Sequence, residues 1–335
     1  MKSIILKSLP LMAALLLPLA SCDDEPEVGS TLYPESPENY DAKLYINETA
    51  LPGNQTSLEV VQTPVSLIIP DNEISFYVRL TKPVTTDVTV NVTENPELAA
   101  AYLSDAEALP EGSVQLANTS VTIKAGSTVS EQPITLKVTE NEAVKNITST
   151  GVAAISLASN SADIATGANN NTYYVVINKK VTNFKGQSTG ELASLNLIPY
   201  TSFQATVDGY DASDIADGST KTEFWYWNSG GYDVIFSFNE ATPVKALGYY
   251  FASYAGYCPD VVEILTSDDG NTWTSQTGGK VTTSVVPSRK TDIVPFEFYS
   301  AITCNYLMLR VYSCFWTSYG SDYDWPAISE VNLYN

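Results

Sequence analysis

Short runs of alternating apolar and polar residues dominate the first half of this chain. Clear examples are Ile74–Leu80, Val88–Val92 and Ile134–Val138, in which Val, Ile and Leu recur at every second position. Because side chains of a strand point alternately to its two faces, such runs read as strands with one buried face and one wet face. Their short, turn-rich spacing predicts an all-β protein in which residues 41–181 form an immunoglobulin-like β-sandwich.

Three segments interrupt this pattern. Residues 96–103 start with Pro and continue with several Ala, which predicts one short helix. Residues 182–195 carry Gly, Ser, Asn and Gln without periodicity and are expected to form a linker. Residues 22–40 are rich in Pro, Glu, Ser and Asn, which is typical of a flexible tether.

The first 21 residues have the pattern of a secretory signal peptide. Two lysines precede an apolar run over residues 9–19 that is too short to span a bilayer. The run ends in Leu19-Ala20-Ser21-Cys22, which resembles a bacterial lipobox and implies that Cys22 is lipidated. The acidic residues 23–25 resemble the export signal of surface-exposed lipoproteins in Gram-negative glycan-utilisation systems, although a solvated linker would have the same composition. We therefore expect a protein held to the outer membrane by lipid alone and facing the cell exterior.

Composition excludes several classes of function. The chain has 38 acidic and 17 basic residues, a formal charge of -21, so nucleic acids and bare anionic membranes are poor partners. Arg79, Arg289 and Arg310 are the only arginines, which makes paired contacts to phosphate, sulfate or carboxylate scarce. There is no histidine, which removes the commonest general base and the Ser-His-Asp and Cys-His mechanisms. A neutral ligand fits this composition best.

Three cysteines follow Cys22. Cys304 and Cys314 flank one predicted strand, and the ends of an extended segment of that length lie too far apart to form a disulfide. Any disulfide would therefore involve Cys258. Three partly buried free cysteines are equally compatible with the sequence.

Aromatic residues concentrate in the second half of the chain, where all five tryptophans follow residue 199. Some must be buried, but three groups fall in predicted loops. The flat apolar face of an aromatic ring suits the C–H face of a sugar, and neighbouring polar groups can bind the hydroxyls. The candidate carbohydrate-binding residues in these loops are Tyr226, Trp227, Tyr254, Tyr257, Phe315, Trp316 and Tyr319.

Four strings in this half occur in an order that resembles a known family. Asp217–Thr222 is followed by Val262–Trp273, whose Ser267–Asn271 portion reads as a hairpin turn, and then by Tyr306–Val311 and Ala327–Tyr334. Together they resemble the discoidin, or coagulation factor 5/8 type C, domain and its galactose-binding-like branch, carbohydrate-binding module family 32. The resemblance covers roughly residues 190 to 335 and implies a discoidin-type β-sandwich (jelly-roll barrel) over residues 196–335.

The same resemblance implies a calcium ion. Asp217 and Thr222, if the last strand brings them near Glu330, would supply hard oxygen ligands of the kind Ca²⁺ prefers. In the family the equivalents of these three residues are ligands. Ser219 stands where Asp or Asn is usual, so its contribution is open. From spacing alone the segment is equally well an ordinary Asp-Gly turn.

The resemblance also implies a function. Family 32 modules bind sugar in these loops, with a His after the conserved Trp and an Arg in the middle loop. In this chain Tyr226 and Trp227 stand where the family has the His, and Tyr254 and Tyr257 stand in the middle loop. The aromatic platform is retained while the groups that hold a galactose-type sugar are not. The N-terminal domain resembles a module of unknown function that often precedes carbohydrate-binding modules in surface glycan lipoproteins.

These features predict a non-catalytic glycan-binding lipoprotein of a polysaccharide-utilisation type system, working beside an outer-membrane transporter or neighbouring glycan-utilisation lipoproteins. One alternative is a surface adhesin for host protein or lipid. A fimbrial protein matured by trypsin-like cleavage is disfavoured because no Arg or Lys occurs between Cys22 and Lys43. A carboxylate-based glycoside hydrolase is the other alternative. It is disfavoured because the sequence has neither a βα alternation nor a blade repeat.

Overall fold

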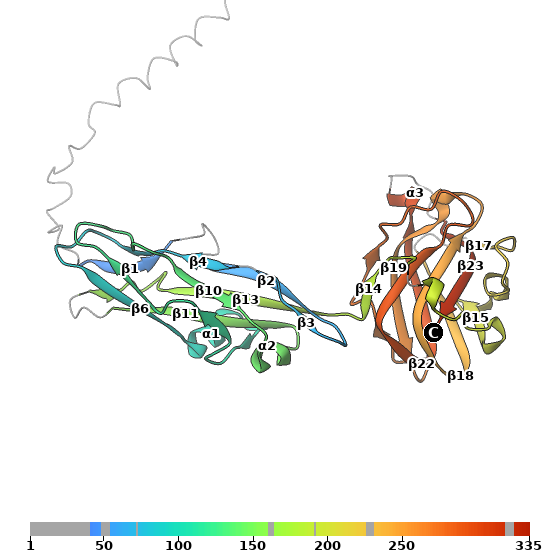
Figure 1. Cartoon of the computed structure of the whole chain (residues 1–335), viewed down its shortest axis with the longest axis horizontal. Coiled ribbons are helices and arrows are strands. Elements are labelled where there is room, and N and C mark those ends of the chain that lie inside the picture. The colour runs from blue at the N-terminus through green and yellow to red at the C-terminus, as the bar shows by residue number, and fades with distance from the viewer. Residues whose placement is uncertain are drawn as a thin grey trace, which may run out of the picture.

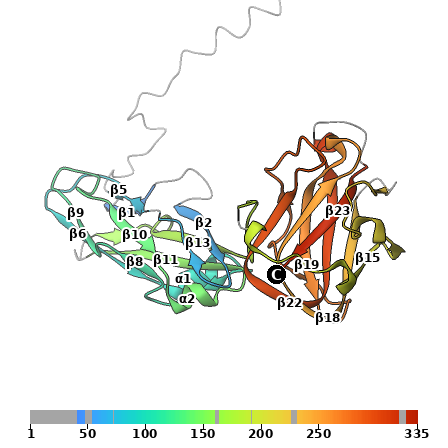
Figure 2. The same ribbon diagram turned by 45° about the vertical axis from the view of Figure 1, so that its right-hand side comes forward.

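The computed structural model describes most of the chain beyond residue 40. The described residues are 41–47, 54–71, 73–159, 164–190, 192–225, 231–318 and 325–335. Almost all regular structure in them is β-strand, and the predicted all-β fold class is confirmed. The strands fall into two regions that lie side by side (Figures 1 and 2), with separate buried cores at residues 42–177 and 198–333.

The N-terminal domain is built from two layers of strands. One layer is a sheet in the order β3-β2-β13-β11-β6-β9, with β7 beside β11. Its strands are β2 (Gln55–Gln62), β3 (Leu67–Ile68), β6 (Val88–Glu94), β7 (Glu107–Ala108), β9 (Ser120–Ile123), β11 (Thr150–Ser159) and β13 (Thr172–Val181). The other layer holds two short sheets, β12-β1-β5 and β4-β10-β8. Its strands are β1 (Lys43–Ile46), β4 (Ile74–Phe76), β5 (Val78–Leu80), β8 (Val114–Leu116), β10 (Ile134–Val138) and β12 (Ala165–Thr166).

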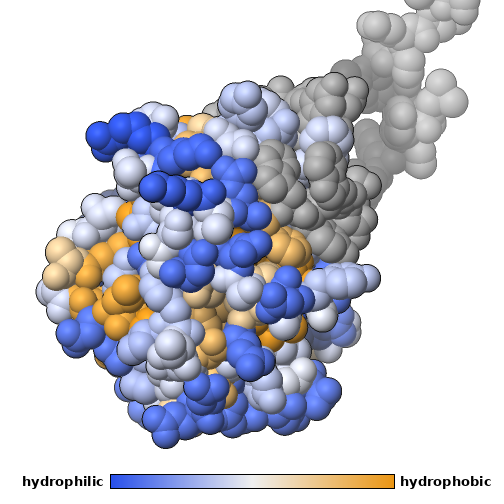
Figure 3. Space-filling model, turned by 90° about the vertical axis from the view of Figure 1, so that its right-hand side faces the viewer, coloured by the Kyte–Doolittle hydropathy of each residue, from blue (hydrophilic) through white to orange (hydrophobic). Residues whose placement is uncertain are grey.

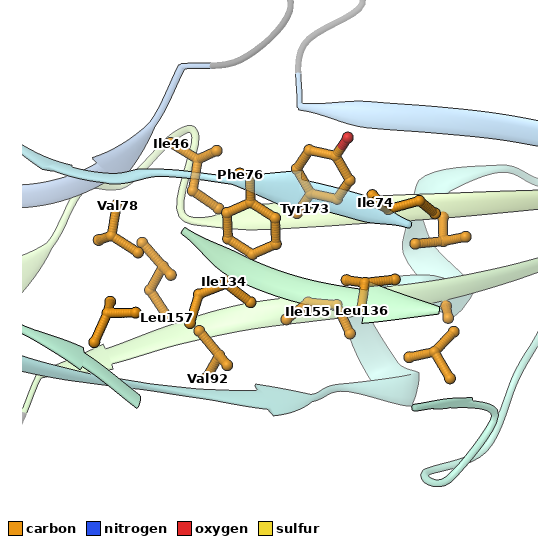
Figure 4. Close-up of a cluster of buried hydrophobic side chains, with 14 of the residues drawn as sticks. Ile46, Ile74, Phe76, Val78, Val92, Ile134, Leu136, Ile155, Leu157 and Tyr173 are labelled. Carbon is orange, nitrogen blue, oxygen red and sulfur yellow. The ribbon is translucent and has the colours of Figure 1, made fainter. Parts of the chain in front are cut away.

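The alternation seen in the sequence places the core between these layers. In β6 and β10 every second residue is buried. Figure 4 shows Ile134 and Phe76 from one layer facing Ile155 and Tyr173 from the other. The rings of Phe76 and Tyr173 stack at a centroid distance of 4.6 Å. Fully burying side chains of this size contributes about 1.5 to 3 kcal/mol each.

Two short helices lie on this domain. α1 (Pro96–Tyr102) confirms the helix predicted over residues 96–103, with Pro in its first turn and the Asn95 side chain accepting from the Leu98 N–H at 3.2 Å. This cap satisfies one of the amide groups left open at a helix start. α2 (Glu142–Asn146) begins with an equivalent cap from Asn141. α1 contacts β11 on the face opposite the main core, where Val152 and Ala154 form a second, smaller cluster with Ala99 and Val176.

The C-terminal domain is one continuous sheet folded into a sandwich. Its central order is β16-β15-β18-β22-β19-β20. Its strands are β14 (Phe184–Gly186), β15 (Phe203–Val207), β16 (Tyr210–Asp211), β17 (Phe224–Trp225), β18 (Tyr232–Phe251), β19 (Pro259–Ser267), β20 (Thr274–Ser275), β21 (Val281–Thr282), β22 (Val294–Cys314) and β23 (Ala327–Tyr334). Short helical turns are η1 (Leu192–Ser194), η2 (Tyr200–Ser202), η3 (Ser213–Ile215), η4 (Ala255–Tyr257) and α3 (Phe315–Ser318).

Two long strands, β18 and β22, connect the layers of this sandwich. The first half of β18 pairs with β15, the second half pairs with β23, and β22 runs alongside both halves. The β18–β22 register shifts between Ser237 and Thr242, and such irregularities let a strand bend from one layer into the next. β19 and β20 pair around the predicted Ser267–Asn271 turn, in which Gly270 has φ +74°, so that turn is confirmed.

The junction between the domains is shorter than the linker expected over residues 182–195. Only Thr182 and Asn183 separate β13 from β14, and both are buried. The Asn183 N–H donates to Gln276 O at 2.8 Å, and its amide group exchanges hydrogen bonds with the Ser300 backbone. Residues 184–186 already pair with β22 and so belong to the C-terminal sheet. The polar composition that suggests a linker here reflects hydrogen-bonding partners of a packed junction.

Among the described residues, no helix combines the length and the apolar character needed to cross a bilayer. Cys258, Cys304 and Cys314 are buried and form no disulfide with one another, which matches the second of the two alternatives left open by the sequence. Burial raises the pKa of the Cys258 and Cys304 thiols, so these groups stay protonated at neutral pH.

Candidate functional site

Three of the predicted aromatic residues form a cluster at one end of the C-terminal domain. Tyr254 and Tyr257 lie on the turn that contains η4, and Trp316 lies on α3, which Figure 1 shows at the tip of this domain. The Trp316 ring is 4.2 Å from the Tyr257 ring and 6.3 Å from the Tyr254 ring, measured between centroids. Tyr254 is 65% exposed, so the cluster presents aromatic surface to solvent. We call these three residues the aromatic cluster.

Gly256 makes the close packing of this cluster possible. A Cβ atom at Gly256 would lie 2.0 Å from Trp316 Nε1 and 2.2 Å from its Cε2. The indole therefore rests directly on the backbone between the two tyrosines. Only glycine allows this approach, because contacts so short do not occur with a real side chain.

Polar groups border the aromatic cluster. Ser253 has φ +52°, an uncommon conformation for a residue with a side chain, and its N–H and hydroxyl both donate to the Glu223 carboxylate at 3.1 and 2.9 Å. Lys290 lies 2.8 Å from the same carboxylate. These contacts fix the start of the Tyr254 turn. They also hold a carboxylate and an ammonium group near the residue that precedes Tyr254.

The remaining predicted aromatic residues divide into two groups. Phe315 does not belong to the cluster, although it precedes Trp316: it is 6% exposed and packs in the domain core. Neighbouring residues at the start of α3 point in different directions, so one faces inward and the next outward. Tyr226, Trp227 and Tyr319 lie outside the described residues.

The predicted metal-binding residues converge at the loop after η3. The Asp217 carboxylate accepts from the Ser219 N–H at 2.8 Å and from the Thr222 hydroxyl at 2.9 Å. The Ser219 N–H also donates to Glu330 Oε2 at 3.0 Å, although Glu330 is far away in sequence. The Thr222 hydroxyl lies 2.9 Å from Ser219 O. Hence the structure brings Asp217, Ser219, Thr222 and Glu330 together.

Glu330 is the buried carboxylate of this group. It is 2% exposed, and its Oε1 has no hydrogen-bond partner among the described residues. Burial, and secondarily the negative charge of Asp217, raises the pKa of Glu330 to about 7, against the opposing effects of the Ser219 and Gly218 N–H groups and the Tyr200 hydroxyl. A buried carboxylate with an unsatisfied oxygen is costly unless a cation or a proton compensates it.

These residues fit a calcium ion. Two carboxylates, a hydroxyl and a backbone carbonyl form the mixed set of oxygen donors that Ca²⁺ prefers. Within the described part of the chain, no three Asp, Glu, His or Cys side chains gather tightly enough to hold a metal by themselves. Backbone and hydroxyl oxygens would therefore supply part of the coordination.

Sequence reasoning missed Gly256, Glu223 and Lys290. Each acts through a contact with a segment far away in the sequence, so no local pattern marks it. In the sequence, only the aromatic composition of the loops indicates a binding site here.

Figure 3 views the molecule from the side of the C-terminal domain and shows apolar patches among a mostly hydrophilic exterior.

Comparison with known proteins adds the following. A family model described as a "-like, N-terminal domain" matches residues 39–164. No curated protein matches the chain. A crystal structure of a two-domain protein of unknown function from Bacteroides fragilis NCTC 9343 is 16% identical and has a TM-score of 0.53, over 89% of this chain and 96% of that one.

Carbohydrate-binding modules of family 32 are similar to part of the chain. One, from Clostridium perfringens NanJ in complex with galactose, is 14% identical with a TM-score of 0.33, over 42% of this chain and 99% of that one. Another, also from Clostridium perfringens and in complex with GalNAc-β-1,3-galactose, is 12% identical with a TM-score of 0.33, over 42% of this chain and its whole own length. The likeness to the Bacteroides fragilis protein, over most of both chains, establishes a shared two-domain fold.

Proposed function

We propose that this protein binds glycan without catalysis, through the aromatic cluster Tyr254, Tyr257 and Trp316. The observation that carries the proposal is this exposed cluster, held in place by the glycine contact at Gly256. Aromatic rings bury the apolar face of a sugar at little entropic cost, because a ring side chain has few rotatable bonds. Glu223 and Lys290 at its border supply the directional hydrogen bonds that a sugar hydroxyl needs.

A neutral glycan suits the cluster better than a charged one. The chain carries a net charge of -21, which repels anionic ligands at long range. Lys290 is already paired with Glu223, so its charge is largely compensated. Stacking therefore supplies most of the affinity in this proposal, and binding depends only weakly on salt.

The test replaces Trp316 by Ala and measures binding by glycan array and then by calorimetry. We expect a loss of about 1 to 3 kcal/mol, the range for an aromatic anchor at a binding hot spot. Smaller losses of binding free energy are expected for Tyr254→Ala and Tyr257→Ala. A tyrosine contributes either its ring or its hydroxyl to a sugar, and the remaining aromatic residues partly compensate for the loss of one such contact. Tyr210 is a matched control, since it is an exposed tyrosine of the same domain outside the cluster. Unchanged glycan binding by a folded Trp316→Ala protein would remove the cluster from the function and favour the adhesin alternative.

We further propose that the protein acts at the cell surface, anchored to the outer membrane through lipid on Cys22. The support is the Leu-Ala-Ser-Cys string at the end of the signal-like segment. There it would present glycan to an outer-membrane transporter or to neighbouring glycan-utilisation lipoproteins. Cys22→Ala should release the protein from the membrane fraction, and retention of that variant in the membrane would disprove lipid anchoring.

Calcium at Asp217, Ser219, Thr222 and Glu330 is also part of the proposal. The converging oxygen donors and the unsatisfied Glu330 Oε1 support it. A cation bound only to the folded state stabilises that state by mass action. Chelator should therefore lower the melting temperature of the C-terminal domain, and Asp217→Asn should abolish the difference between calcium and chelator.

A further inference from the structure

A groove on the N-terminal domain has the features of a second binding site. It has a volume of about 340 Å³, and it opens between α1, the start of β13 and the loop before β13. The residues that line it are Asn54, Leu98, Tyr102, Ala168, Asn169, Asn170, Asn171, Thr172 and Tyr174. This volume is at the lower end of the range found for small-molecule sites.

One wall of the groove is aromatic. The Tyr102 and Tyr174 rings stack at 3.7 Å with an interplanar angle of 11°. The Tyr102 hydroxyl donates to Gln55 Oε1, which links the end of α1 to β2. Both rings pack on the small cluster under α1 but are only partly buried. The wall is therefore rigid and still accessible from the groove.

Amide side chains also line the groove. Asn54 donates to Ile46 O at 2.9 Å, and Asn171 donates to Gly167 O at 3.0 Å. Asn54 and Asn170 have φ +45° and +60°, which fixes the backbone of both segments in an uncommon conformation. Asn169 and Asn170 are exposed at the rim. An amide offers both a donor and an acceptor, as a sugar hydroxyl requires.

None of the described residues that line the groove is charged. A phosphate, a sulfate or a carboxylate ligand would need Lys, Arg or a helix N-terminus, and a cationic ligand would need carboxylates. Packing of the tyrosines on α1 explains the aromatic pair but gives no reason for a hollow lined by amides. A stacked aromatic pair together with neutral donors and acceptors in one groove matches an uncharged, polyhydroxylated ligand.

We propose that this groove binds a neutral oligosaccharide, which makes the N-terminal domain a second glycan-binding module of the same chain. The proposal goes beyond the proposed function and does not depend on it, because it involves other residues in another domain. Two sites of this kind on one chain would bind a long glycan with higher avidity than either site alone.

The test uses the full chain and an array of neutral oligosaccharides of glucose, galactose, mannose, xylose and N-acetylglucosamine. It is run on the Trp316→Ala background, so that binding at the aromatic cluster is weakened. Tyr174→Ala and Asn169→Ala should each reduce the remaining binding, Tyr174→Ala by roughly 5- to 150-fold as expected for an aromatic anchor. Asn169 is exposed, so its replacement leaves the fold intact even if Tyr174→Ala does not. Tyr77→Ala is the control, because Tyr77 is an exposed tyrosine of the same domain that does not line the groove.

The outcomes separate the two proposals. If Trp316→Ala alone abolishes all binding to the array, the groove binds none of these sugars and this inference is wrong. If Asn169→Ala and Tyr174→Ala bind as their background does, the inference is equally wrong. If they reduce binding while Trp316→Ala in the parent does not, the groove is the glycan site and the proposed function of the aromatic cluster fails.

Discussion

Protonation of Glu330 should make the stability of the C-terminal domain depend on pH in a way that calcium reverses. The pKa of Glu330 is raised from 4.5 to about 7, chiefly by burial and then by the charge of Asp217. A group whose pKa is higher in the folded state stabilises that state while it is protonated. In chelator, stability should therefore be highest below the ordinary pKa and should be lost as pH rises through about 7. The pKa difference corresponds to about 3 kcal/mol, as an order of magnitude.

Replacing Glu330 by Gln tests this prediction. Gln cannot ionise, so in chelator the variant should lose this part of the pH dependence and be more stable than the parent at about pH 8. In saturating calcium the order should invert, because the variant lacks a ligand that the parent has. Denaturant unfolding followed by tryptophan fluorescence reports on the C-terminal domain alone, since all five tryptophans follow residue 199.

Glu240→Gln provides the matched control, because Glu240 is an exposed carboxylate of the same domain that is not one of the candidate calcium ligands. This variant should keep the pH dependence of the parent. A Glu330→Gln protein with the parent's pH slope in chelator would refute the reasoning from burial. Equal effects of the variant in chelator and in calcium would remove calcium from the account.

Two further predictions concern the aromatic cluster and the buried residue beside it, Phe315. Gly256→Ala should displace the Trp316 indole and weaken glycan binding by about 1 to 3 kcal/mol in calorimetry. Gly190→Ala is the control and should leave binding unchanged, because a Cβ there meets only Ser188 Oγ, at 3.4 Å. Phe315→Ala should cost about 3 to 5 kcal/mol of stability in denaturant unfolding, because the ring is buried in the core. A stability loss below about 1 kcal/mol would mean that Phe315 is a surface residue after all.

Local patterns predicted local structure well. Alternation in β6 and β10, the Pro start of α1 and the Ser267–Asn271 turn are each determined by a few consecutive residues, and the structure has all of them. The sequence also indicated which residue types gather near Glu330, through its resemblance to a family. It could not indicate which of two neighbouring aromatics, Phe315 or Trp316, faces the core.

Contacts between distant segments were beyond the reach of the sequence. Gly256 is recognisable as necessary only when the Trp316 ring lies on it. The polar, non-periodic composition of residues 182–195 predicts a linker, and no local pattern shows that Phe184 pairs with β22, more than a hundred residues away. In each case the decisive interaction depends on tertiary packing, which a single sequence does not display.

The two domains meet at the buried junction formed by Thr182 and Asn183. Val181 O lies so close to Gly278 that even a methyl group there would clash, and Asn183 is hydrogen-bonded to Gln276 and to Ser300 of β22. A junction of this kind restricts changes in the spacing between the groove and the aromatic cluster. Polysaccharides whose repeat matches that spacing would be bound at both places without bending, whereas shorter oligomers would occupy one place at a time. The protein would then select chains by length and stiffness as well as by sugar composition.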